Sequence, residues 1–107
     1  ADVVTGVGTL ASGQNVTRGA VLGRLTADGT LKMVDSTKSD GTQTIYAIAA
    51  DAVNATSAAQ PVPLYFTGEF NKAALTFGGT DTAATHEVAA RNIGIFFKSN
   101  VTVGGTN

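Results

Sequence analysis

Few side chains in this sequence have the type and spacing that catalysis or metal binding requires. His86 and Glu87 are adjacent, and His86 is the only histidine among the 107 residues. A zinc site of the His-Glu-x-x-His kind needs two histidines one helical turn apart, so this pair does not predict one. We therefore expect His86 to be a solvated side chain on a polar helix face.

The acidic and glycine-rich segments are equally poor in catalytic patterns. The loop over residues 35–44 is rich in carboxylates and hydroxyls, but it lacks the ligand spacing and the bidentate Glu of a calcium loop, so we expect plain Asx turns. Gly6-Val7-Gly8 lacks the spacing of a dinucleotide loop. Glu69 has no second carboxylate near it in the sequence, no serine lies in a nucleophile-elbow pattern, and cysteine is absent. These patterns predict a protein that is not an enzyme, with no catalytic residue, metal or cofactor.

Composition limits the partners and the core. The chain is 43% hydrophobic but only 7% aromatic and has no Trp, so few large side chains can anchor a deep core. This favours a thin, strand-rich domain that gains stability from partner chains. Seven Lys and Arg against eight Asp and Glu, without a basic run, argue against nucleic-acid binding. No apolar run approaches the roughly 20 residues that span a bilayer, so we expect no membrane contact.

Short strand patterns separated by turns fill most of the chain. Residues 21–26 and 31–34 flank Asp28-Gly29, a strong hairpin signal. Residues 45–50 form the most apolar run and predict a central strand. Pro61 and Pro63 place the start of the strand over residues 62–67 at an edge or beside a bulge.

One helix is predicted, over residues 80–92. Thr80 or Asp81 is expected to cap its start, and the i,i+4 pair of Glu87 and Arg91 supports it. Ala84 and Val88 would form its thin apolar stripe.

The N-terminal residues have two possible structures. Residues 3–10 alternate as a strand does but include Gly6 and Gly8, so they are expected to have little packing of their own. One interpretation is an arm that completes the sheet of another protein, and the other is an ordinary or frayed edge strand. The residues that would make such an arm are Val3, Val4, Thr5, Val7, Thr9 and Leu10.

The segment GQNVTRGAVLG, residues 13–23, is expected to be a hinge between this leader and a compact body. Gly13 and Gly19 can take backbone angles closed to other residues, and Asn15 tolerates a left-handed bend. The hinge residues are Gly13, Asn15, Arg18 and Gly19.

Several stretches, in this order and spacing, resemble the head decoration proteins of tailed phages, typified by protein D of phage lambda. They are GQNVTRGAVLG, DGTQTIYAIAADAV, LYFTGEFNKAAL and the closing helix with RNIGIFFK. The resemblance implies a mainly β, β-clip-like single domain with one or two short helices and an extended N-terminal arm. It also implies a homotrimer at three-fold and quasi-three-fold sites on the outer surface of the expanded capsid, made in the cytoplasm of the bacterial host. There it would bind the major capsid protein and stabilise the head against packaged DNA.

Within that resemblance the chain divides into an arm over residues 1–12, a body over 13–98 and a C-terminal tail over 99–107, which is expected to be mobile. Apolar side chains that the thin body cannot cover would hold the trimer together. The candidates, for which an intrachain core is the alternative, are Val62, Leu64, Tyr65, Phe66 and Phe70.

Two other classes of protein are possible rivals. A trimeric clip-fold enzyme, such as a nucleotide hydrolase, would need convergent carboxylates and a phosphate-binding loop, and neither is evident. A carbohydrate-binding module would need exposed aromatic side chains, for which only Tyr46 and Tyr65 are available in strand patterns.

Overall fold

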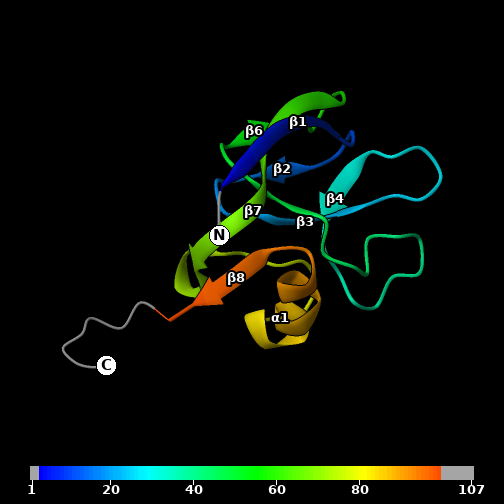
Figure 1. The fold of residues 1–107 in the computed structure, drawn as a ribbon. Helices are drawn as coiled ribbons and strands as arrows, with labels where there is room; N and C mark the ends of the chain where they lie inside the picture. The colour runs from blue at the N-terminus through cyan, green and yellow to red at the C-terminus, as the bar shows by residue number, and fades with distance from the viewer. Residues whose placement is uncertain (1–2, 100–107) are drawn as a thin grey trace.

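The structure, a computed structural model, describes residues 3–99 of the chain. The predicted tail over residues 99–107 lies, apart from its first residue, outside the described residues. The elements in chain order are β1 (Val4–Leu10), β2 (Asn15–Val16), β3 (Val21–Arg24), β4 (Leu31–Met33), β5 (Ala47–Ala49), β6 (Val53–Asn54), β7 (Gln60–Asn71), the 3-10 helix η1 (Lys72–Ala74), α1 (Ala83–Asn92) and β8 (Ile95–Lys98) (Figure 1).

The main sheet closes on itself because one long strand has partners on both sides. Its strands follow the order β1, β4, β3, β5, β7, β8, and β1 also pairs with β7, so the first five form a barrel-like ring. The last residues of β7 leave the ring and pair in parallel with β8. The short strands β2 and β6 pair beside the ring, on the side away from α1 (Figure 1). The described chain is therefore a single, mainly β domain of mixed strand direction with one α-helix.

Strand alternation distributes the apolar side chains between two cores. In β3, Leu22 points into the ring and packs in the first cluster, while its neighbour Val21 packs in the second. In β5, Ala47 and Ala49 belong to the first cluster and Ile48 to the second. The second cluster also takes in residues of β8 and α1, so the helix covers the outer side of the ring.

The N-terminal residues form an edge strand of the sheet, which was one of the two structures predicted from sequence, and the expectation of a leader separate from the body is wrong. β1 pairs antiparallel with β7 from Val4↔Thr67 to Leu10↔Gln60, and the Leu10 side chain is 0% exposed in the ring core. A Cβ at Gly6 would lie 2.4 Å from the Phe66 ring. The glycine is thus required by packing within the chain, and residues 4–10 belong to the same sheet as the predicted body.

The expected bends at the two glycines of the predicted hinge are present, but Asn15 makes none. Gly13 and Gly19 have φ values of 94° and 93°. A Cβ at Gly19 would lie 2.4 Å from the Ala74 carbonyl oxygen. Asn15 instead starts β2 and pairs with Asn54, with no left-handed backbone. Because β1 is part of the sheet, this segment connects strands of one body rather than two bodies.

The hairpin and central strand predicted from sequence are confirmed. β3 and β4 pair antiparallel around the Asp28-Gly29 turn, and β5 lies between β3 and β7. The expected Asx turn at Asp40 is also confirmed, since its Oδ1 accepts a hydrogen bond from the Thr42 amide at 3.0 Å.

The helix begins later and faces the other way than predicted. Thr82, rather than Thr80 or Asp81, is its N-cap, and the Thr82 amide donates to Thr85 Oγ1 at 3.0 Å. Glu87 and Arg91 approach within 3.8 Å, as expected for the i,i+4 pair. However, Ala84 and Val88 face solvent, while His86 and Ala90 are buried. Neither helix among residues 3–99 is both long and apolar enough to cross a bilayer.

Candidate functional site

One edge of β1 is occupied by β7, and the register shows which backbone groups point there. Val7 is opposite Pro63, and Thr9 is opposite Pro61. Proline has no N–H, so neither of these pairs can exchange two backbone hydrogen bonds. The hydrogen-bonded pairs of this ladder are therefore Gly6 with Leu64 and Gly8 with Val62. The N–H and C=O of Val7 therefore point away from β7.

Backbone contacts on the neighbouring strands agree with this orientation. The Pro63 carbonyl accepts from the Ala50 amide at 2.9 Å, on the side of β7 that faces away from β1. On the outer edge of β1, β4 reaches only Leu10, where Leu31 is its partner. Among residues 3–99 no strand pairs with this edge before Leu10, so it is open (Figure 1).

Three exposed valines lie on β1 or directly before it. Val7 is 70% exposed, and Val3 and Val4 are also largely exposed. β-Branched residues favour extended backbone, and proteins usually cover or charge an edge of this kind because it can pair with another chain. The edge can give and accept backbone hydrogen bonds with an extended segment, which is the chemistry of strand addition.

A second exposed feature is a cleft of about 450 Å³ beside β7. Tyr65 and Phe70 line it, with ring centroids 5.4 Å apart, and Arg18 Nη2 donates to the Tyr65 hydroxyl at 3.4 Å. The cleft is thus an apolar recess with a hydrogen-bonded rim, and it contains two of the five residues predicted for a trimer interface.

The other predicted interface residues are used inside the chain. Val62 and Leu64 are 0% and 1% exposed in the ring core, so neither has surface left to offer another chain. Phe66 lies on the opposite face of β7 from Tyr65 and packs against Tyr46, with ring centroids 5.7 Å apart. Alternation along β7 separates Phe66 from the cleft.

His86 is buried, contrary to the expectation of a solvated side chain. It is 3% exposed and stacks on Phe77 with an interplanar angle of 7°. Its Nε2 lies 2.6 Å from Asp81 Oδ2, and the other Asp81 oxygen accepts from Ser36 Oγ at 2.6 Å. The Asp81 carboxylate lies between the serine and the histidine, so the histidine does not activate the serine as a nucleophile. These contacts instead fasten the loop after β4 to the helix.

Hydrogen bonding determines the ionisation of Asp81. Burial raises the pKa of the Asp81 carboxyl, but hydrogen bonds from Ser36 and His86 together outweigh burial and hold it below its usual value of 3.8. Since the pKa is lowered in the folded state, the resulting stabilisation is present above pH 3.8 and is lost as the pH falls below it.

Replacing Asp81 by Asn is expected to lower the free energy of unfolding by about 1–3 kcal/mol at pH 7, because an amide cannot accept from all three donors, which are the Ser36 amide, the Ser36 hydroxyl and the His86 ring. The difference between wild type and variant should shrink as the pH falls below 3.8. Urea unfolding at several pH values measures it, with Glu87→Gln on the exposed helix face as control. A difference that stays constant down to pH 2 would contradict the assignment. Asp28 and Asp40, whose pKa values are also lowered, titrate in both proteins and cancel. The pKa of Asp35 is lowered by hydrogen bonds from Thr37 but raised by the charge of Asp81, so Asp81→Asn also changes the titration of Asp35.

Sequence reasoning identified the strand pattern of β1 but missed which of its groups are open. The available signal was the spacing of Pro61 and Pro63, because these two positions of β7 have no N–H to donate to a neighbouring strand. Nothing in the sequence predicted the contact between Asp81 and His86, apart from the short distance between them along the chain. Among residues 3–99, no group of three or more His, Cys, Asp or Glu side chains is placed to hold a metal ion.

A small closed sheet whose edge strand is open offers backbone groups with which another extended chain can pair, and it presents no catalytic arrangement among the described residues. The family model of the bacteriophage lambda head decoration protein D matches residues 1–95. The chain therefore belongs to the lambda head decoration protein D family. Proteins of this family are structural capsid proteins on the surface of the virion and are not enzymes, so neither rival class applies. No individual curated protein matches the chain significantly.

Proposed function

We propose that this head decoration protein is a β-clip-like homotrimer that binds the expanded capsid at three-fold and quasi-three-fold sites. It stabilises the head against the pressure of packaged DNA by adding β1 to a sheet of the major capsid protein. The observation that carries this proposal is the open outer edge of β1, where the N–H and C=O of Val7 point away from β7.

The energetics of strand addition fit a multivalent protein. Each backbone hydrogen bond contributes a net of about 0.5–1.5 kcal/mol, so a single edge with few bonds holds weakly. Three edges on one trimer act at high effective concentration, which raises avidity by roughly 10²–10⁴. A trimer thus turns a weak edge contact into a stable clamp that joins neighbouring capsid subunits.

The cleft beside β7 supports the proposed assembly of the trimer. Tyr65 and Phe70 are partly exposed there, and aromatic side chains with a polar tip are enriched in protein interfaces. We place these two residues at the contact between chains. Val62, Leu64 and Phe66 are left out, because they pack within the sheet of one chain.

Two measurements test the proposal. Sedimentation velocity of the purified chain is expected to give the mass of three chains. Mixing the chain with expanded, undecorated heads of its own phage is expected to show stoichiometric density at three-fold positions by electron microscopy. A monomer that leaves such heads bare would overturn the proposal.

A further inference from the structure

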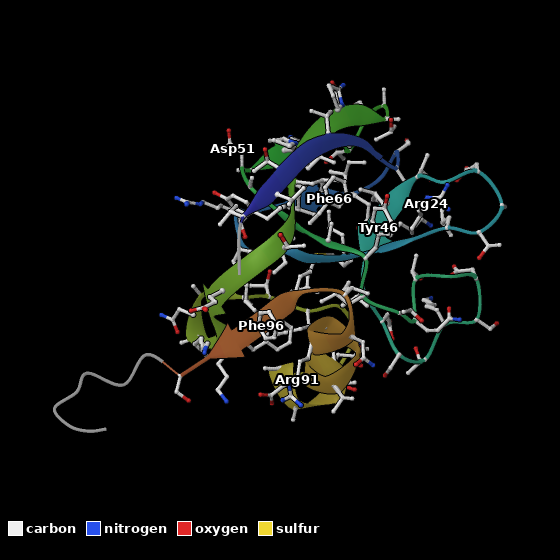
Figure 2. All side chains as sticks on the ribbon, in the orientation of Figure 1. Arg24, Tyr46, Asp51, Phe66, Arg91 and Phe96 are labelled. Carbon is white, nitrogen blue, oxygen red and sulfur yellow. The ribbon has the colours of Figure 1, made fainter. Side chains whose placement is uncertain are left out.

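A row of three side chains crosses the mouth of the ring beside the open edge of β1. The Phe66 ring fills the space under Gly6, where any other residue would place its side chain. Tyr46 meets Phe66 edge-on, and Arg24 Cζ lies 5.9 Å from the centroid of the Tyr46 ring. Figure 2 shows the row running from β1 toward the β3–β4 hairpin. We call Phe66, Tyr46 and Arg24 the edge platform.

The edge platform is accessible from solvent. Tyr46 is 38% exposed, Arg24 is exposed, and Phe66 is partly buried. Phe66 reaches this position from β7 because Gly6 has no side chain to block it. An extended segment paired with the outer edge of β1 would turn alternate side chains toward the side of the sheet that Phe66 covers. Those side chains would meet the edge platform.

Arg24 has a positive charge that no carboxylate of the described chain neutralises. The ion pairs among residues 3–99 are His86–Asp81 and Arg91–Glu87. Asp28, in the same hairpin as Arg24, instead accepts hydrogen bonds from the amide and hydroxyl of Thr30 at 2.9 and 2.7 Å. A guanidinium that lies over an aromatic ring keeps its N–H donors available for a two-bond contact with a carboxylate.

We propose that the edge platform selects the segment that β1 accepts: an extended stretch of the capsid protein with an apolar side chain over Phe66 and Tyr46 and an Asp or Glu that pairs with Arg24. This inference rests on the proposed strand addition and specifies its partner. Backbone pairing alone is nearly independent of sequence, whereas an apolar contact next to a charge pair fixes the register of the added strand.

The test compares Arg24→Gln with Arg91→Gln in binding to expanded, undecorated heads, at several salt concentrations. Arg91 is a matched control, because it is also an exposed arginine but lies on α1 and is paired with Glu87 (Figure 2). Arg24→Gln is expected to weaken binding of the trimer about tenfold in total and to flatten its salt dependence, because three solvent-exposed charge pairs, each weak on its own, are lost. Arg24→Lys, which keeps the charge without the planar fork, is expected to fall between wild type and Arg24→Gln.

A proline at Val7, which blocks the open edge itself, separates failure of this inference from failure of the proposed function. If Val7→Pro loses binding while Arg24→Gln binds with wild-type affinity and salt dependence, the edge of β1 binds the capsid protein but Arg24 does not pair with a carboxylate there. The inference is then wrong, and the proposed function stands. If both variants bind as the wild type does, strand addition at β1 is wrong and the inference falls with it. If Arg24→Gln and Arg91→Gln weaken binding equally, the effect is one of net charge, and the inference is again overturned.

Discussion

Val7→Pro is expected to weaken binding to expanded heads on the order of 10²-fold without unfolding the protein. The variant removes the outward N–H of Val7 and places a ring at the open edge, so β1 of each chain loses about one hydrogen bond of roughly 1 kcal/mol to the capsid protein. The three chains of a trimer together lose about 3 kcal/mol, which is about two factors of ten in affinity. The head-binding affinity of the purified variant measures this.

The same variant should keep its own sheet intact. The amide of Val7 does not bond to β7, because its partner there is Pro63, so the intrachain ladder loses nothing. The preceding residue, Gly6, is already part of an extended strand, the conformation that a following proline favours. Val7→Thr, which keeps the N–H and the β-branched shape, is the matched control and should bind as the wild type does. If Val7→Pro bound expanded heads with wild-type affinity, the proposal of strand addition through this edge would be wrong.

Leu10→Ala is expected to have the largest effect on stability, lowering the free energy of unfolding by about 2–5 kcal/mol. Leu10 is 0% exposed at the end of β1, where both β7 and β4 pair with it. Truncation leaves a cavity in the ring core, and the loss is a large part of the roughly 5–15 kcal/mol that stabilises a domain. Urea unfolding of the purified variant measures it.

Val7→Ala provides the comparison within the same strand. Its side chain is 70% exposed, so truncation should change stability by only about 0.5 kcal/mol. If Leu10→Ala were as mild as Val7→Ala, β1 would not be packed against the ring in solution. The comparison thus decides between the two structures predicted from sequence, an edge strand of the domain and a leader that packs little on its own chain.

Local patterns predicted the elements that depend on neighbouring residues. The Asp28-Gly29 turn specified the β3–β4 hairpin, and Glu87 with Arg91 marked the helix. The face that the helix buries was not predictable, because Val88 is more hydrophobic than His86 and yet is the exposed one. Asp81 and Ser36 make burial of His86 favourable, and Ser36 is 45 residues from Asp81 in the chain. Contacts over such separations leave no periodic signal.

The sequence by itself determined that the first residues are extended, that the domain is mainly β, and that the chain lacks the patterns of an enzyme. These properties follow from alternation, composition and residue type, all of which are local. Only the tertiary structure decided that β1 pairs with β7, that Tyr65 and Phe66 face opposite sides of the sheet, and that Phe66, Tyr46 and Arg24 stand in one row. The physical reason is that an extended strand has two edges and two faces, and only its partners from distant parts of the chain decide which edge and which face remain open.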